Sequence, residues 1–137
     1  MIQIERIDHV VLRTAQLEAM LEFYARVLGV KLERSLEDLG LYQLRAGASL
    51  IDIVDVEGPI GKPGGAAPGR SGRNLDHFCL KVADFDVAAI GDHLRRCGVE
   101  TGEVAQRYGA EGTGPSIYIQ DPDGNTVELK GPPAPSQ

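Results

Sequence analysis

The sequence predicts an α+β protein built from two tandem β-α-β-β-β modules. An Asp-His pair opens an apolar, β-branched run twice, in IDHVVLRT from Ile7 and in LDHFCLKV from Leu75. Each run is followed by an amphipathic helical pattern that ends at a glycine, and then by strand patterns. The number of residues between the two histidines is almost the same as the number between the two glycines that end the helical patterns. A repeat at this spacing indicates a duplicated structural unit.

In the first half, a strand over residues 7–12 is followed by a helix. Gly29 ends this helix, whose apolar positions follow the i, i+3, i+4, i+7 spacing: Leu17, Met20, Leu21, Tyr24, Val27 and Leu28. Three strands are then expected, near residues 30–34, 41–45 and 49–56.

The second half repeats this order. A strand over 75–82 precedes a helix, which Asp84 or Asp86 caps and Gly98 ends. The apolar positions of this helix are Val87, Ile90, Leu94 and Cys97. Strands are expected near 99–104, 116–120 and 126–130. The segment DPDG at 121–124 predicts a tight turn before the last strand. The extra residues of this copy fall in the Gly-rich segment 102–115, which we expect to be a loop, either a long hairpin connection or a lid.

We expect one domain over residues 1–137, divided into module one (5–57), a linker (58–74), module two (75–131) and a tail (132–137). The linker is rich in Gly and Pro, which leave it no helical or strand period. A loop of this length in a compact domain is either mobile or functional.

Composition excludes several classes of function. The net charge of −6, the absence of Trp and an aromatic content of 5% argue against nucleic-acid binding. No apolar run is long enough to span a membrane, and the first residues do not resemble a signal peptide. We interpret Cys79 and Cys97 as buried thiols, which is typical of the reducing cytoplasm.

Strand alternation places four potential metal ligands. A helix covers one face of each sheet, so the apolar positions point to the helix and the intervening ones point away. On the helix-free faces lie His9 and Asp52 in module one, and His77 and Glu128 in module two. Imidazole and carboxylate groups are usual ligands of divalent transition metals. The duplication favours a metal site over unrelated roles.

Each of these residues alone has a simpler interpretation. A single strand histidine is usually an ordinary polar residue, and Glu128 alone suits a solvated strand position. Asp52 has Arg45 and Lys81 as alternative partners. We interpret His93, in the polar part of the second helix, as a surface residue.

These segments together resemble the vicinal oxygen chelate superfamily. That superfamily contains glyoxalase I, fosfomycin-resistance enzymes, methylmalonyl-CoA epimerase, extradiol dioxygenases and bleomycin-resistance proteins. The resemblance covers residues 7–130 and depends on DHVVLRT…LEFYARVLGV, LDHFCLKV and SIYIQDPDGNTVELK. It is closest to glyoxalase I-like proteins. It implies mixed sheets that curl round a metal-binding cleft, with the helices outside.

The resemblance implies metal ligands in the first and last strand of each module, at His9, Asp52, His77 and Glu128. Asp52 is one methylene shorter than the Glu typical of glyoxalase I-like members, so it binds the ion either directly or through water. A site of three ligands would be similar to the fosfomycin-resistance arrangement. The ligand types suit Zn, Ni, Co, Mn or Fe(II). A homodimer is also implied, with the site formed either within one chain or across two.

The resemblance also implies a lyase or isomerase similar to lactoylglutathione lyase, which stabilises an enediolate-type intermediate on the metal. Glu128 would act as the catalytic base and Asp52 as a second acid or base. Arg13, Lys81 and Tyr118 would contact the small-molecule substrate, such as a glutathione adduct. The alternatives are a fosfomycin-type epoxide-opening enzyme, another member such as a dioxygenase, and a non-catalytic small-molecule binding protein.

Overall fold

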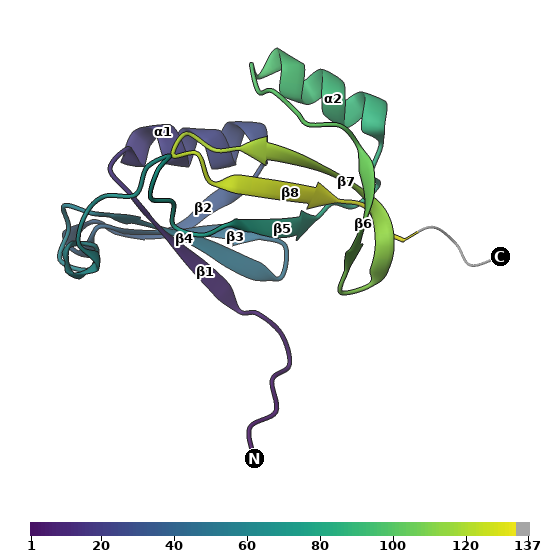
Figure 1. Cartoon of the computed structure of the whole chain (residues 1–137). Coiled ribbons are helices and arrows are strands. Elements are labelled where there is room, and N and C mark those ends of the chain that lie inside the picture. The colour runs from purple at the N-terminus through teal and green to yellow at the C-terminus, as the bar shows by residue number, and fades with distance from the viewer. Residues whose placement is uncertain (134–137) are drawn as a thin grey trace. The chain divides into compact units, whose positions relative to one another are not determined.

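A computed structural model describes residues 1–133 of the chain, so residues 134–137 of the predicted tail lie outside it. The chain divides into two compact units, Met1–Asn74 and Leu75–Gln137. Each unit carries one four-stranded mixed sheet and its own helix (Figure 1). The predicted α+β class and the duplicated β-α-β-β-β order are therefore confirmed. Over the described residues, no helix combines the length and the apolar character needed to cross a membrane.

Unit 1 has the sheet order β1-β4-β3-β2, in which β1 runs parallel to β4 and the other neighbours are antiparallel. A parallel pair needs a crossover connection, which the helical segment supplies. The elements are β1 (His9–Thr14), α1 (Leu17–Glu22), η1 (Phe23–Val27), β2 (Lys31–Leu36), η2 (Glu37–Leu39), β3 (Leu41–Ala46), β4 (Ser49–Asp55) and η3 (Lys62–Gly64).

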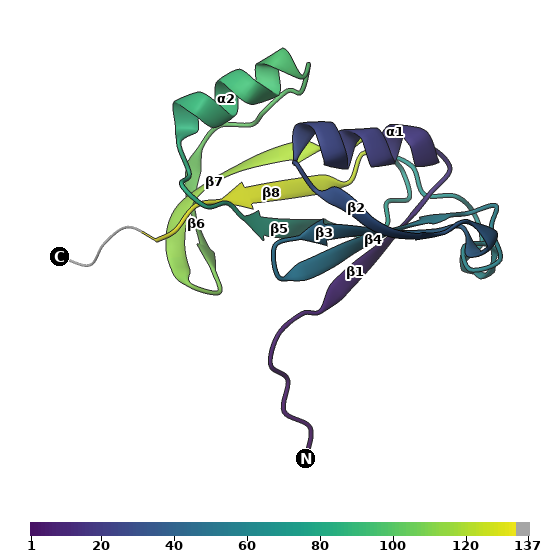
Figure 2. The ribbon, with the colours of Figure 1, turned by 180° about the vertical axis from the view of Figure 1, so that it is seen from behind.

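Unit 2 repeats this topology with the order β5-β8-β7-β6, and β5 runs parallel to β8 (Figure 2). Its elements are β5 (His77–Lys81), α2 (Val87–Arg96), β6 (Ala105–Gly109), β7 (Gly112–Gln120) and β8 (Thr126–Lys130). The first and last strands of the unit are therefore direct neighbours in its sheet, as they are in unit 1.

The predicted helices form, with one change of geometry. In unit 1 the α-helix passes into a π-helical turn at Phe23, and Gly29 ends it with a φ of +66°. Met20 and Tyr24 are fully buried in this stretch. In unit 2 the Asp86 carboxylate accepts a hydrogen bond from the Ala89 N–H at 3.0 Å, so Asp86 is the residue that caps α2.

The expected apolar faces are also present. In unit 1 the central strand β4 buries Ile51 and Ile53, and in unit 2 β8 buries Val127 and Leu129. The strand before it, β7, buries Ile117 and Ile119. These are the residues that alternation assigned to the helix side of each sheet.

The predicted strand at 99–104 is wrong. The strand forms later, as β6, and pairs with β7 in a hairpin in which Tyr108 lies opposite Thr113. Most of the Gly-rich segment expected to be a loop is therefore strand. Glycine suits this hairpin at position 114, because a Cβ on Gly114 would lie 2.7 Å from the Pro132 carbonyl oxygen. Glycine here serves a close backbone approach and does not interrupt the sheet.

The DPDG turn forms as predicted and is fixed by one carboxylate. Asp121 Oδ1 accepts hydrogen bonds from the N–H groups of Asp123 at 3.0 Å and Asn125 at 2.9 Å. Asp121 Oδ2 accepts a third from the Asn125 amide at 2.8 Å. Asp121 and Asn125 are buried, so these bonds are shielded from water. The turn sets the start of β8 and thus the position of Glu128.

Replacing Asp121 with Ala should lower the free energy of unfolding by about 2 kcal/mol, because it leaves buried backbone donors unsatisfied. Chemical denaturation of the two proteins measures the difference. Asp38→Ala is the matched control, because Asp38 is exposed, and it should change the stability by less than about 0.5 kcal/mol. Equal losses in both variants would contradict the role given to Asp121.

Candidate functional site

In unit 1 the strand register places His9 and Asp52 on one face of the sheet. The parallel pairing of β1 with β4 sets Val11 opposite Asp52, and His9 lies two residues before Val11. Side chains two residues apart on a strand point to the same face. This face is the one that alternation assigned away from the helix.

Asp52 is a buried carboxylate with incomplete hydrogen bonding. The residue is only 3% exposed. Gln43 donates to its Oδ2 at 3.3 Å, whereas Oδ1 is buried and has no hydrogen-bond partner among residues 1–133. Arg45, one of the expected partners, instead forms a two-point ion pair with Glu33 at 2.9 Å. A buried, unsatisfied carboxylate oxygen is costly, and a bound cation would satisfy it.

Asp8 holds the His9 imidazole. Its Oδ1 lies 2.7 Å from His9 Nδ1. This hydrogen bond is the main cause that raises the pKa of His9, and the nearby Asp52 charge raises it further. The same hydrogen bond lowers the pKa of Asp8. When Nδ1–H donates to the carboxylate, the lone pair of neutral imidazole is on Nε2, the nitrogen then available to a metal.

Unit 2 contains the equivalent residues, and its imidazole lies next to its carboxylate. Asp76 Oδ2 lies 2.6 Å from His77 Nδ1, and His77 Nε2 lies 3.5 Å from Glu128 Oε1. Two ligands bound at about 2.1 Å in a tetrahedral site are separated by about 3.4 Å. The spacing of these two donor atoms therefore fits a shared divalent ion.

Glu128 is buried, at 5% exposure, so the simpler interpretation of a solvated strand residue is wrong. Its neighbour across the sheet is Cys79. Partial burial, followed by the Glu128 charge, raises the pKa of Cys79 to about 11. The thiol therefore stays protonated at neutral pH. Both cysteines are free thiols, but the prediction that both are buried is wrong. The residue Cys79 is exposed, because it lies on the helix-free face of an edge strand, and Cys97 is half-buried.

Tyr118 connects the histidine of unit 2 to a cation. Its ring packs edge-on against His77, with 5.6 Å between the ring centroids. The guanidinium carbon of Arg107 lies over the same ring, 4.2 Å from its centroid. Arg107 Nη1 donates to both the carbonyl and the hydroxyl oxygen of Ser116, at 2.8 and 2.9 Å.

The two cations predicted to contact substrate have protein partners. The Arg13 guanidinium donates to the carbonyl oxygens of Gly61, Gly65 and Ala66, at 3.1, 2.7 and 3.1 Å. It thereby ties the linker to β1, and Asn74 adds two hydrogen bonds to the Arg13 backbone. Lys81 Nζ pairs with Glu111 at 2.5 Å.

The structure thus brings the predicted ligands together as two pairs, one in each unit. Within residues 1–133 no three or more His, Cys, Asp or Glu side chains are grouped so that they could hold a metal ion. Sequence reasoning gave no role to Asp8, Asp76, Gln43 or Arg107. The repeated Asp before each histidine was an available signal for the first two, whereas the pairing of Gln43 and the stacking of Arg107 depend on strand register.

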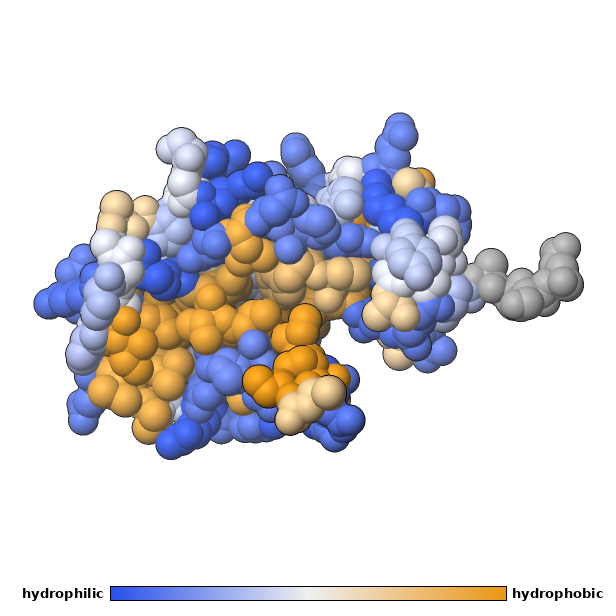
Figure 3. All heavy atoms as spheres, turned by 60° about the horizontal axis from the view of Figure 1, so that its bottom comes forward, coloured by the Kyte–Doolittle hydropathy of each residue, from blue (hydrophilic) through white to orange (hydrophobic). Residues whose placement is uncertain are grey.

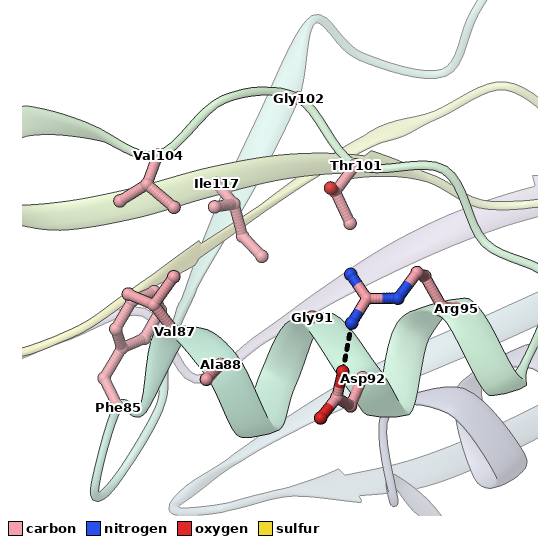
Figure 4. Close-up of a pocket in the computed structure, with 10 residues that line it drawn as sticks. All are labelled: Phe85, Val87, Ala88, Gly91, Asp92, Arg95, Thr101, Gly102, Val104 and Ile117. Carbon is pink, nitrogen blue, oxygen red and sulfur yellow. Dashed lines mark hydrogen bonds and ion pairs between the residues drawn. The ribbon is translucent and has the colours of Figure 1, made fainter.

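A cavity of about 280 Å³ lies on the helix side of the unit 2 sheet, between α2 and β7 (Figure 4). Val87, Val104 and Ile117 form its apolar wall, and Asp92 and Arg95 lie along the helix at its edge. Ile117 and Tyr118 are consecutive in β7 and so point to opposite faces. The cavity is therefore distinct from the face that carries His77 and Glu128.

Comparison with known proteins identifies the family. The family model for the Glyoxalase/Bleomycin resistance protein/Dioxygenase superfamily matches residues 6–129, nearly the whole chain. The chain belongs to this superfamily. The predicted resemblance is therefore confirmed at the level of the family.

Two curated relatives align over most of the chain. Virulence protein STM3117 of Salmonella typhimurium is 29% identical over 127 residues, which cover 92% of this chain and 83% of that protein. Biphenyl-2,3-diol 1,2-dioxygenase 3 of Rhodococcus globerulus is 33% identical over 135 residues. That alignment covers 91% of this chain but only 62% of the dioxygenase, so the chain spans less than two thirds of its length.

Solved structures share the fold. The crystal structure of virulence protein STM3117 has a TM-score of 0.80 at 26% identity, with 96% of this chain and 99% of that chain covered. Lactoylglutathione lyase from Agrobacterium tumefaciens has a TM-score of 0.66 at 23% identity, with 92% of each chain covered. The second similarity establishes the fold alone.

Replacing Asp8 with Asn should lower the pKa of His9 toward its ordinary value of about 6.5, because the charged acceptor is removed. A raised pKa in the folded protein stabilises it below that ordinary pKa, and this stabilisation is lost as the pH rises through the folded-state pKa. Imidazole proton shifts in a pH titration of the metal-free protein measure the change. Asp38→Asn is the control, and an unchanged His9 pKa in Asp8→Asn would contradict the assigned cause.

Proposed function

We propose that the protein is a divalent-metal-dependent lyase or isomerase resembling lactoylglutathione lyase. One observation carries the proposal. In each unit, an imidazole whose Nδ1 is held by the preceding Asp shares the helix-free sheet face with a buried carboxylate. The same ligand types, with the same supporting contact, occur in both copies.

His9, Asp52, His77 and Glu128 would hold the ion. The chemistry of the set suits Zn, Ni, Co, Mn or Fe(II), and the unsatisfied Oδ1 of Asp52 supports a cation beside it. Asp52 binds either directly or through water, and the site forms either within one chain or across a homodimer. When bound, such an ion acts as a Lewis acid that stabilises negative charge on adjacent substrate oxygens.

The remaining chemistry belongs to side chains of the chain. Glu128 would leave the ion when substrate binds and would then take a proton from the carbon next to the substrate carbonyl, as a positioned carboxylate can. Asp52 would be the second acid or base. Tyr118, beside His77, would contact the substrate, and Lys81 and Arg13 would do so after exchanging their present partners. The substrate class is a small molecule such as a glutathione adduct, and we place the activity in the cytoplasm.

Metal titration and activity test this proposal. The full chain should bind a divalent ion, and His9→Ala and His77→Ala should each weaken binding by at least about 100-fold, because each removes a direct ligand. The metal-loaded protein should form thioester from methylglyoxal and glutathione, measured by ultraviolet absorbance. Glu128→Gln should lower kcat by about 100-fold or more, because it removes the base.

His93→Ala is the matched control, because this histidine lies in α2 and contacts Cys97, so metal affinity should be unchanged. Metal binding that survives both His9→Ala and His77→Ala would contradict the ligand assignment. A folded, metal-loaded protein without thioester formation, tested with all five metals, would contradict the lyase assignment.

We include a homodimer in the proposal, supported by exposed apolar side chains (Figure 3). In unit 1, Ile2, Ile4, Ile7 and Val11 are 85%, 83%, 72% and 49% exposed. Apolar residues gathered along one segment and strand are typical of a surface that a partner covers. A second copy of this chain is the expected partner.

Replacing Ile7 with Asp should weaken dimerisation by at least about tenfold, because a charge would be buried at the interface. Sedimentation equilibrium measures the association constant. Leu39→Asp is the control, because Leu39 is also partly exposed but lies in η2. A wild-type chain that sediments as a monomer would contradict the homodimer.

A further inference from the structure

Arg107 is a half-buried cation whose position is fixed from two sides. Its guanidinium lies 4.2 Å from the Tyr118 ring centroid, a cation–π arrangement. Its Nη1 is also held by both oxygens of Ser116. Ser116 is fully buried, so this anchor is rigid. The guanidinium therefore has a defined orientation with little rotamer freedom left to lose on binding a ligand.

The other edge of this guanidinium is free of protein partners within residues 1–133. The hydrogen bonds of Arg107 to this part of the chain involve Nη1, and Nε and Nη2 form no hydrogen bond or ion pair there. Arg13 differs, because its Nε, Nη1 and Nη2 each donate to a linker carbonyl oxygen. The Nε–Nη2 edge of a guanidinium matches the two oxygens of a carboxylate or phosphonate.

The surroundings of Arg107 carry excess positive charge. Register places three cations, Lys81, Arg107 and Lys130, on the same face of the unit 2 sheet as His77 and Glu128. Glu111 neutralises Lys81. Lys130 is 7% exposed and donates to the Gly112 carbonyl oxygen at 3.0 Å. Among the strand residues that register places on this face in the described part of unit 2, Glu128 is the one carboxylate, and it does not balance both Arg107 and Lys130.

We propose that Arg107, held by Tyr118 and Ser116, is the anion-binding residue of the substrate site and receives a carboxylate or phosphonate group of the substrate. This inference rests on the proposed function, because it places the anion site beside the proposed metal centre. Tyr118 touches both the Arg107 guanidinium and the His77 ring. The substrate therefore carries an oxyanion at one end and the reacting oxygens at the other.

Oxyanion binding to the full-length, metal-free protein tests the inference. The probes are acetate and methylphosphonate, titrated while the amide signals of Ser116 and Tyr118 are followed by NMR. The variants are Arg107→Met, which removes the charge at similar length, and Arg107→Lys, which keeps the charge but removes the two-point edge. Arg96→Met is the matched control, because Arg96 is exposed on α2 of the same unit. Circular dichroism checks that each variant is folded.

The wild-type chain and Arg96→Met should bind at least one probe with equal affinity. Arg107→Met should lose at least about tenfold in affinity and Arg107→Lys a smaller amount, because a charge-assisted pair of hydrogen bonds is lost. Tighter binding of acetate would identify a carboxylate substrate, and tighter binding of methylphosphonate a phosphonate. Unchanged affinity in folded Arg107→Met, or no binding of either probe to the wild-type chain, would overturn the inference.

His9→Ala separates this inference from the proposed function. It removes a proposed metal ligand of unit 1, whereas Arg107, Tyr118 and Ser116 all lie in unit 2, so oxyanion affinity should stay within about threefold of wild type. A chain that binds oxyanions through Arg107 but binds no metal would retain the anion site and refute the metal-dependent function. A metal-loaded enzyme that is active, and whose KM is the same in the wild type and in Arg107→Met, would support the metal-dependent function and refute the anion site.

Discussion

The candidate site depends on the parallel pairing of the first and last strand in each unit. This pairing makes β4 the neighbour of β1 and β8 the neighbour of β5, although more than thirty residues separate the strands in each pair. The register then places an imidazole and a carboxylate on one sheet face. A shift of one residue would send one of them to the helix side. The apolar alternation that fills the core therefore also fixes the site.

Burial of the two carboxylates is the constraint that most favours a cation. Asp52 and Glu128 are almost fully buried, and Asp52 receives one hydrogen bond from Gln43. Removing carboxylates from water without full compensation costs several kcal/mol. A fold optimised for stability alone would place apolar residues there. The presence of two carboxylates at these buried positions, together with the two Asp-held histidines, supports a site in which bound charge offsets this cost.

Much of the fold was predictable, because it follows from local periodicity. The duplicated topology follows from the repeated Asp-His and helix patterns, the DPDG turn from its Pro and Gly residues, and the strand at 126–130 and the face assignments from alternation. The strand at 99–104 could not be located correctly, because β6 is fixed by its pairing with β7 and by the close approach of Gly114 to Pro132. Long-range pairing overrides local propensity there.

The ligand types were predictable, whereas their surroundings were not. The engagement of Arg13 by linker carbonyl oxygens and the stacking of Arg107 on Tyr118 join residues that no periodic pattern connects.

X-ray absorption spectroscopy of the zinc-loaded protein tests the central claim most directly. The account predicts two imidazole ligands and carboxylate oxygens at about 2.0–2.2 Å from zinc. One imidazole should disappear from the spectrum in His9→Ala and the other in His77→Ala. A wild-type spectrum with fewer than two imidazoles, or with sulfur from Cys79 in the first shell, would contradict the claim that the two histidines bind a common ion.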